Sequence, residues 1–378
     1  MVFGGRAVPA AMEVTEGGVT IQVPELADGS TGESVFYNPR QELNRDITIA
    51  ALRTCRERMT GIETYLDANT ASGIRGIRAA ADGWTVTCVD RDPEATELCR
   101  QNFATTGLDG TVLRDDANVV LHSDRFDIID LDPFGSPIPF ADAAVRASNA
   151  VLCVTATDTA PLCGAHFTAG IRRYGAIPRN TEYHREVGLR VLLSALCRIA
   201  AQHDIAITPL LSHAETHYVR TYLRIDSGAK RADEALSQLG TLYHCTSCLH
   251  RETEQERVVT RKERCPNCGD HSLLIGGPFW LGNTHNDSFV SATKERIDDD
   301  AGTAEAGRKL LQTIEDELHL PMHFDQHKLC KQWNRTAPSM ETFLEDIRAA
   351  GYSVSRTHYG GTTFKTDAPV GTIQDATE

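Results

Sequence analysis

The first half of the chain alternates short runs of β-type residues with longer segments that have the spacing of helices. The runs that predict strands are residues 64–67, 85–90, 111–114, 126–132 and 150–155, and residues 39–59 predict a helix before the first of them. Strands that alternate with helices are typical of βαβ units, which build a mostly parallel sheet. The pattern therefore predicts an α/β domain with a mostly parallel sheet.

A long helical pattern over residues 181–202 precedes two further strand-like runs, 205–211 and 218–225. A final pair of this kind commonly adds an antiparallel edge to a parallel sheet. The alternation stops near Ser227-Gly228-Ala229-Lys230, and 378 residues exceed what one hydrophobic core usually supports. We therefore predict two domains, one over residues 1–230 and one over residues 231–378.

The predicted second domain has an α+β pattern. A cysteine-pair module occupies residues 241–275, and helical patterns follow near residues 302–319 and 338–350. Strand-like residues on both sides of a Gly360-Gly361 turn predict a β-hairpin over residues 352–365. Two helices followed by a hairpin is the order of a winged-helix-like domain.

The distribution of apolar residues excludes a membrane-spanning helix, because no window approaches about eighteen uninterrupted apolar positions. The first residues lack the charged start and the long apolar run of a secretory signal. We therefore expect a cytoplasmic protein.

The net charge of −14 by itself argues against a nucleic-acid partner, because binding to phosphates usually requires a basic surface. Only seven of the 38 basic residues are lysines, and the composition resembles that of salt-adapted proteins, in which acidity reflects solvation rather than the choice of partner. The densest basic run extends from Arg172 to Arg190. It is either an RNA contact or the solvated face of a helix.

Three predicted strands end in acidic residues. The first ends at Asp67 and continues into a small-residue turn over residues 68–76, which would let a nucleotide-type ligand approach the backbone. Asp90 closes the second strand, where a carboxylate can bind ribose hydroxyls. Asp116, beside Asp115 and Ala117, follows the third, where it can reach an adenine amine. Because the G-x-G-x-x-G pattern of dinucleotide folds is absent, the segment favours a methyltransferase. The alternative is that these acidic residues only cap loops.

Asp132-Pro133-Phe134 follows the fourth strand and contains the parts of a site for an exocyclic aryl amine. Such an amine is a weak nucleophile because its lone pair is delocalised into the ring. A carboxylate and a backbone carbonyl can hold the amine and direct the lone pair toward a methyl donor, while an aromatic face fixes the base. The alternative is a strand-end turn with a buried phenylalanine.

Four cysteines of the predicted second domain have the spacing of a zinc site. Cys245 with Cys248 and Cys265 with Cys268 form two C-x2-C pairs that are sixteen residues apart. Two such pairs can place four thiolates tetrahedrally around Zn²⁺, and a four-cysteine site leaves no open position, so we expect a structural metal. Unligated thiols or a redox pair are the alternatives.

Together these motifs resemble the archaeal and eukaryotic tRNA (guanine-26) N2-dimethyltransferases. The similar segments, besides the cysteine pairs, are residues 36–39, 44–46, 71–76, 132–137, 157–164 and 356–358. The resemblance implies a Rossmann-like class I S-adenosylmethionine-dependent methyltransferase domain followed by an α+β zinc-containing C-terminal domain that binds tRNA. It also implies the transfer of one or two methyl groups to the exocyclic N2 of guanine 26.

Carried over by position, the resemblance assigns roles to individual residues. The cofactor contacts are Arg45, Arg75, Asp90, Asp116 and Ala117, the target-amine site consists of Asp132, Phe134 and Phe36, and the zinc ligands are Cys245, Cys248, Cys265 and Cys268. On its residue type alone, Arg45 could bind the cofactor carboxylate or be a surface arginine. The turn at residues 68–70 departs from the family pattern, which affects the expected cofactor affinity but not the cofactor's identity. We expect tRNA as the partner, no membrane association and a monomer.

Two other functions fit the sequence less well. The Asp-Pro-Phe triplet alone would also suit an amino-methyltransferase that acts on another guanine, or on another exocyclic amine of RNA or DNA. A non-enzymatic zinc-ribbon nucleic-acid binder could be built on a degenerate methyltransferase fold. The intact acidic strand ends and Asp132 argue against such decay.

Overall fold

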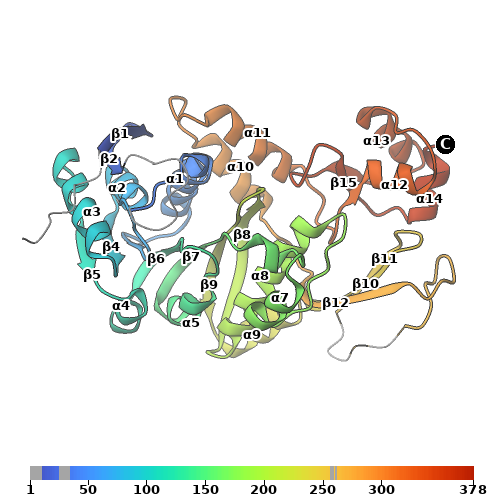
Figure 1. Ribbon diagram of the computed structural model, residues 1–378, viewed down its shortest axis with the longest axis horizontal. Helices are drawn as coiled ribbons and strands as arrows, with labels where there is room; N and C mark the ends of the chain where they lie inside the picture. The colour runs from blue at the N-terminus through green and yellow to red at the C-terminus, as the bar shows by residue number, and fades with distance from the viewer. Residues whose placement is uncertain (1–10, 25–34, 256–258, 260–261) are drawn as a thin grey trace, which may run out of the picture. The chain divides into compact units, whose positions relative to one another are not determined.

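The computed structural model describes residues 11–24, 35–255, 259 and 262–378. The chain divides into two compact units, and Figure 1 labels its helices and strands. Unit 1 comprises Met1–Asp132, Arg146–Leu152 and Ala292–Lys309, and unit 2 comprises Pro133–Val145, Cys153–Ser291 and Leu310–Glu378. None of the helices in the described part of the chain combines the length and the apolar character needed to cross a membrane.

Unit 1 contains the parallel βαβ units that the sequence predicts. Its strands are β3 (Thr64–Asp67), β4 (Thr85–Asp90), β5 (Thr111–Arg114) and β6 (Phe126–Leu131). Adjacent strands in the order β5-β4-β3-β6 are parallel. The connecting helices are α2 (Ile74–Ala81), α3 (Pro93–Thr106) and α4 (Ala117–Ser123), and α1 (Glu42–Arg58) precedes the sheet after a short 3-10 turn. The carboxyl ends of the four parallel strands therefore lie on one edge.

An N-terminal hairpin in unit 1 has no counterpart among the sequence-based predictions. Its strands β1 (Ala11–Glu16) and β2 (Val19–Pro24) are antiparallel, and Val19, Ile21 and Val23 are buried. The side chain of Asn102 on α3 accepts a hydrogen bond from the Gln22 amide and donates one to its carbonyl. The hairpin is thereby fixed to a helix of the parallel sheet.

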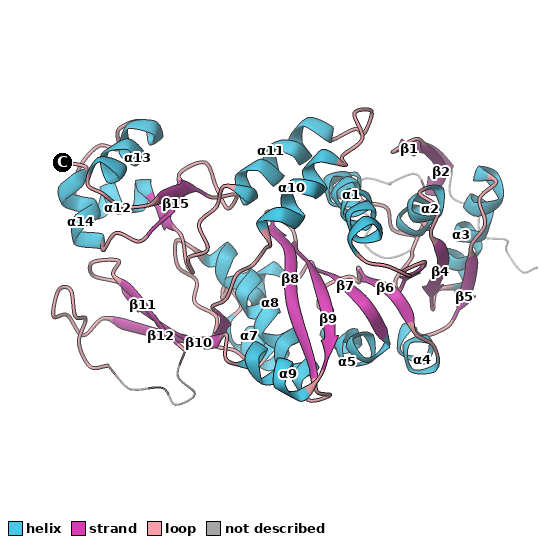
Figure 2. Ribbon diagram, turned by 180° about the vertical axis from the view of Figure 1, so that it is seen from behind, coloured by secondary structure: helices cyan, strands magenta, loops and turns pink. Residues whose placement is uncertain are grey.

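The seven-stranded sheet has the order β5-β4-β3-β6-β7-β9-β8, and residues of β7 (Ser148–Ala156) belong to both units. In unit 2, β8 (Ile205–Ala214) and β9 (Val219–Ser227) are antiparallel neighbours, which confirms the predicted antiparallel edge (Figure 2). The helices of this part of unit 2 are α5 (Ile138–Ala147), α6 (Thr159–Leu162), α7 (Phe167–Tyr174), α8 (His184–Ala201) and α9 (Ala229–Leu236). Together with the parallel strands, this edge confirms the Rossmann-like fold class.

The remainder of unit 2 contains two small antiparallel sheets. The first joins β11 (Arg251–Glu254), β10 (Leu239–Cys245) and β12 (Leu273–Trp280), and the second joins β13 (Phe324–Asp325), β15 (Thr363–Thr366) and β14 (Val354–Arg356). Helices α10 (Asp287–Glu295) and α11 (Ala304–Glu315) lie between them in the sequence, and each contains residues of both units. Helices α12 (Gln326–Gln332), α13 (Met340–Ala349) and α14 (Val370–Ala376) follow. Phe343 and Phe364 pack in the core of this last segment. The predicted order of helices followed by a hairpin is confirmed.

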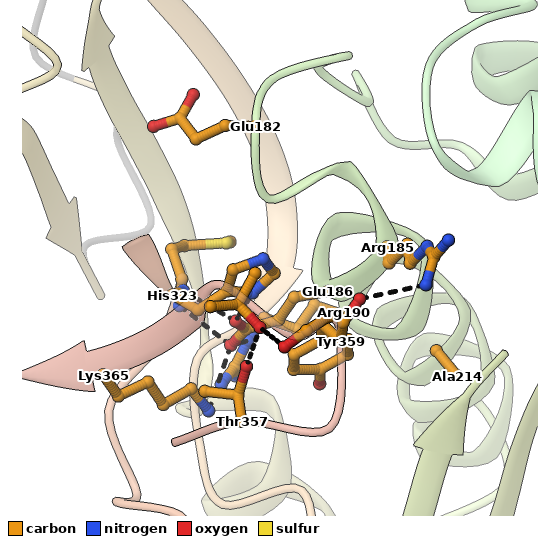
Figure 3. Close-up of polar contacts among 12 residues, drawn as sticks. Glu182, Arg185, Glu186, Arg190, Ala214, His323, Thr357, Tyr359 and Lys365 are labelled. Carbon is orange, nitrogen blue, oxygen red and sulfur yellow. Dashed lines mark hydrogen bonds and ion pairs between the residues drawn. The ribbon is translucent and has the colours of Figure 1, made fainter. Parts of the chain in front are cut away.

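A buried charge cluster within unit 2 joins α8 to the C-terminal segment (Figure 3). Glu186 is completely buried and accepts hydrogen bonds from the amides of Met322 and His323, both at 2.8 Å. It also pairs with Arg190 at 2.8 Å and with Lys365 at 3.4 Å. Buried charges need such partners, because an unpaired charge in a protein interior is strongly destabilising.

Several arginines of the basic run from Arg172 to Arg190 have partners within the protein. Arg190 is buried against Glu186, Arg179 donates to the carbonyl of Ile275 at 2.7 Å, and Arg185 donates to the carbonyl of Tyr359 at 3.0 Å. Arg173 pairs with Asp158 at 2.9 Å. The interpretation of this run as an RNA contact is wrong for Arg190, since its guanidinium is inaccessible to a phosphate.

Candidate active site and metal centre

The turn after β3 is held against β4 by main-chain hydrogen bonds. The amide of Thr70 donates to the carbonyl of Val89, and the amide of Ala71 donates to Oδ2 of Asp90 at 3.1 Å. The other oxygen of Asp90 accepts from the amide of Asp92 at 3.0 Å. The Asp90 carboxylate is thus fixed from both sides beside the turn, and each oxygen retains a lone pair for a ligand hydroxyl.

Close approach between α2 and the sheet explains a glycine of the turn motif. A Cβ at Gly76 would lie 2.3 Å from Sγ of Cys88 and 3.3 Å from Oδ2 of Asp67. With no side chain there, the Gly76 amide donates to the same Asp67 oxygen at 3.0 Å. Burial, followed by the charge of Asp130, raises the pKa of Asp67 to about 7. The end of β3 therefore carries a buried carboxyl group, that of Asp67, with a pKa near neutral pH.

Arg75 on α2 contacts the end of β6 and helix α1. Its Nη2 lies 2.6 Å from Oδ2 of Asp132, and its Nη1 lies 3.8 Å from Oδ2 of Asp130 and donates to Thr48 at 3.2 Å. Arg75 and Asp130 are buried, whereas Asp132 keeps 18% of its side chain exposed. The structure therefore brings a predicted cofactor contact and the predicted amine-holding carboxylate together, and Asp132 remains partly accessible.

Arg45 lies in a second buried ion-pair network. Its Nε and Nη2 donate to the two carboxylate oxygens of Glu16 at 2.7 and 2.5 Å, and Tyr37 donates to Glu16 at 2.5 Å. Arg78 also pairs with Glu16 and with Asp46. The interpretation of Arg45 as a surface arginine is wrong, since its side chain is only 6% exposed. The sequence did not indicate Glu16 as a partner, because 29 residues separate the two.

Asp116 is the N-cap of α4. Its Oδ1 accepts from the amide of Asn118 at 2.8 Å, and the side chain is exposed, whereas Ala117 is buried in the first turn of the helix. An aspartate in this position stabilises the helix N-terminus. Asp116 therefore caps a helix, and its role in binding an adenine amine stays a prediction.

The two predicted stacking residues have exposed aromatic rings. Phe36 in unit 1 is 41% exposed, and Phe134 in unit 2 is 70% exposed. The alternative of a buried phenylalanine at position 134 is therefore wrong. Exposing an aromatic side chain forgoes the stabilisation that its burial would give, so this exposure is consistent with a ligand contact.

Thr157 determines the conformation of the turn after Phe134. Its hydroxyl accepts from the Gly135 amide at 2.7 Å, and its amide donates to the Gly135 carbonyl at 3.0 Å. Gly135 has a φ of +80°, a left-handed conformation that favours glycine. The segment containing Thr157 was part of the resemblance, but no role could be assigned to this residue without the structure.

A pocket of about 220 Å³ lies within unit 2 between α6, the start of α8, and the β8–β9 turn. Its lining includes His184, Arg185 and Thr216. None of the predicted catalytic or cofactor residues lines it. We therefore base the functional interpretation on the strand ends rather than on this pocket.

The four predicted zinc ligands converge in unit 2. Sγ of Cys245 lies 3.7 Å from Sγ of Cys268, and Sγ of Cys248 lies 3.7 Å from Sγ of Cys265. Zinc–sulfur bonds of about 2.3 Å in a tetrahedron place the sulfur atoms about 3.8 Å apart, whereas a disulfide brings them to about 2.0 Å. The amides of Leu249 and Gly269 close the two knuckle turns. The arrangement therefore fits a four-thiolate metal site.

Comparisons with known proteins agree over nearly the whole chain. The family described as N2,N2-dimethylguanosine tRNA methyltransferase matches residues 17–378. A protein of Haloarcula marismortui named tRNA (guanine(26)-N(2))-dimethyltransferase is 56% identical over 366 residues, which is 97% of this chain and 100% of that protein. A protein of the same name from Natronomonas pharaonis is 56% identical over 370 residues, with the same coverage.

A solved structure has the same fold. Trm1 from Pyrococcus horikoshii, in a complex with S-adenosyl-L-methionine, superposes with a TM-score of 0.86 at 34% sequence identity. The match covers 97% of this chain and 99% of that one.

Proposed function

Because the chain belongs to the family of N2,N2-dimethylguanosine tRNA methyltransferases, we propose that it transfers methyl groups from S-adenosylmethionine to the exocyclic N2 of guanine 26 in tRNA. Relatives with this activity in their names are 56% identical over their whole length. The geometric observation that carries the proposal is the partly exposed Asp132 carboxylate held by Arg75 at 2.6 Å. This carboxylate is at the carboxyl end of a parallel strand, where α/β folds bind their ligands.

The residues at the strand ends suit the parts of S-adenosylmethionine. Asp90 would accept hydrogen bonds from ribose hydroxyls, and Asp116 with Ala117 would contact the adenine. Arg45 and Arg75 are the candidates for the cofactor carboxylate. Arg45 already donates two hydrogen bonds to Glu16, so Arg45 would bind the cofactor carboxylate only through another of its N–H groups. When bound, the cofactor supplies an electrophilic methyl group.

The side chains of the target-amine site have complementary roles in the proposed reaction. Asp132 would accept a hydrogen bond from the guanine N2 amine and orient its lone pair. The ion pair with Arg75 fixes the Asp132 carboxylate before the base arrives, which reduces the reorganisation needed in the transition state. Phe134 and Phe36 would stack on the base. After the methyl group has been transferred, the nitrogen loses a proton either to Asp132 or to water.

We also propose that Cys245, Cys248, Cys265 and Cys268 bind a structural Zn²⁺. The sulfur distances of 3.7 Å support a tetrahedral site with no open position. The domain over residues 231–378 would supply most of the surface that recognises the shape of tRNA. A monomeric state and a cytoplasmic location stay predictions.

The proposed function is tested by incubating the purified protein with S-adenosylmethionine and an unmodified tRNA transcript. Mass spectrometry of the digested nucleosides should detect N2-methylguanosine and N2,N2-dimethylguanosine, and a transcript with adenine at position 26 should yield neither. Methylation of another guanine or another amine would support the amino-methyltransferase alternative. RNA binding without methylation would support the non-enzymatic alternative.

A further inference from the structure

Two histidines and an aspartate of unit 2 converge away from the cysteine knuckles. His285 precedes α10 by two residues, Asp287 is the first residue of α10, and His319 follows α11 in the sequence. We name these three residues the His–Asp cluster. The proposed methylation assigns them no role.

The ligand-type atoms of the cluster are close to one another. Oδ1 of Asp287 lies 2.9 Å from Nε2 of His319 and 3.4 Å from Nε2 of His285. The two imidazole rings are 4.6 Å apart between centroids, and one ligand atom from each residue lies within 4.8 Å of the others. Tetrahedral zinc with nitrogen and oxygen ligands at about 2.0 to 2.2 Å requires ligand separations of about 3.3 to 3.6 Å. The distances from Asp287 to the two histidines, 2.9 and 3.4 Å, are therefore close to those between zinc ligands, and small movements of the side chains would complete the fit.

His285 has a buried nitrogen that no described residue satisfies with a hydrogen bond. The residue is only 3% exposed, and among the described residues its Nε2 has no hydrogen-bond partner, although it lies 3.4 Å from Oδ1 of Asp287. A buried polar nitrogen without a partner is unfavourable, so native proteins rarely contain one without a reason. The other nitrogen, Nδ1, lies 3.5 Å from the hydroxyl of Thr284, a contact that would help to orient the ring.

The other two members of the cluster are accessible from solvent. The side chain of Asp287 is 59% exposed and that of His319 is 32% exposed. An ion could therefore enter from one side, with water completing its coordination.

We propose that His285, Asp287 and His319 bind a second Zn²⁺, with water as the fourth ligand. The donor set of two imidazoles and one carboxylate suits zinc and differs from the four thiolates of the knuckles. The ion would join the start of α10 to the segment after α11. Asp287 and His319, which represent these two segments, are 32 residues apart in the sequence. This inference does not rest on the proposed methylation or on the state of the cysteine site.

Cobalt distinguishes the two sites because thiolate ligands give an intense sulfur-to-metal charge-transfer absorption and imidazole or carboxylate ligands do not. The untagged full-length protein should be stripped with a chelator, kept reduced and titrated with Co²⁺. We expect two equivalents to bind, of which only one produces the charge-transfer band. Elemental analysis after equilibrium dialysis against Zn²⁺ should likewise find two ions per chain.

His319→Ala and the nearly isosteric Asp287→Asn should each lose one equivalent and retain the charge-transfer band. His327→Ala, which removes an exposed histidine of α12, serves as the matched control and should keep both equivalents. Circular dichroism of the metal-free proteins verifies that each variant is folded. Binding of a single equivalent, giving only the thiolate band, would show that the cluster is an ordinary hydrogen-bonded group. A second equivalent that persists in both variants would place that ion elsewhere, and either result overturns the proposal.

Discussion

Replacing Asp132 by asparagine tests the proposed reaction most directly. The substitution removes the negative charge but keeps the size of the side chain and one oxygen that can still accept from Arg75, 2.6 Å away. Alanine would be less informative, because it would leave the 5% exposed guanidinium of Arg75 without its nearest partner. In Asp132→Asn, Arg75 also retains the charge of Asp130 at 3.8 Å. We therefore expect the variant to fold and to bind S-adenosylmethionine.

The size of the rate loss separates two roles of Asp132. A hydrogen bond to a charged group contributes about 1.5 to 3 kcal/mol, and about 1.4 kcal/mol corresponds to a factor of ten. If Asp132 only orients the amine, kcat should therefore fall roughly 10- to 150-fold. General-base catalysis contributes about 10²- to 10⁴-fold, so a loss above roughly 10³-fold would identify Asp132 as the proton acceptor as well.

The measurement is the single-turnover rate of methylation with saturating tRNA, combined with calorimetric titration of S-adenosylmethionine. Asp109→Asn, which neutralises an exposed carboxylate outside the candidate site, controls for the change in net charge and should leave both quantities unchanged. Wild-type turnover by Asp132→Asn would refute the reasoning. A loss of cofactor affinity that accounts for the whole rate loss would assign Asp132 to the cofactor instead of the amine.

Two further predictions concern the second part of the chain. Cys265→Ser should release the metal of the cysteine site and abolish methylation of tRNA, while the binding of S-adenosylmethionine persists. If elemental analysis finds no zinc in the variant and its methylation activity is undiminished, the prediction is wrong. Glu317→Gln should destabilise the protein by roughly 3 kcal/mol at pH 7, because the pKa of Glu317, although raised by burial, is lowered by Lys365 and His358 to about 2 from 4.5. A carboxylate with a lowered pKa stabilises the folded state at pH values above the pKa of the unfolded state, and this stabilisation is lost as the pH falls toward 2. The free energies of unfolding in urea of the variant and the wild type should therefore converge between pH 4.5 and pH 2. An equal difference between them at pH 7 and pH 3 would contradict the prediction.

The local features of the fold could be predicted from the sequence. The bounds of β3, β4 and β5 coincide with the predicted strands because each is a short run of β-type residues that ends in a charged residue, namely Asp67, Asp90 and Arg114. The antiparallel edge and the C-terminal hairpin were also predictable, because they join segments that are adjacent in the sequence. The cysteine site belongs to the same class, since its spacing alone limits the geometry of the four sulfur atoms.

Contacts between distant segments were not predictable. Glu186 meets residues more than a hundred positions away, such as Met322 at a sequence separation of 136, and no local pattern indicates that pairing. The same limitation applies to Glu16 and Arg45. It also explains why the run from Arg172 to Arg190 resembled an exposed basic surface in the sequence, although Arg173 and Arg190 pair with carboxylates of the same chain. A single sequence reports which residues are charged, but it does not report which charges are neutralised inside the fold.

The turn beside Asp90 has a consequence for how this site can change during evolution. Its position is determined by amides, namely those of Thr70, Ala71 and Asp92, and every residue except proline has an amide to donate. Another side chain at position 71 that tolerates its φ of +47° would leave this arrangement in place. Thr70 and Asp92 also act through their side chains, because the Thr70 hydroxyl donates to Asp67 at 2.9 Å and Asp92 is the N-cap of α3. Position 76 is the opposite case, because any side chain there would collide with Cys88. A search for distant members of the family should therefore give Gly76 a high weight and position 71 a low one.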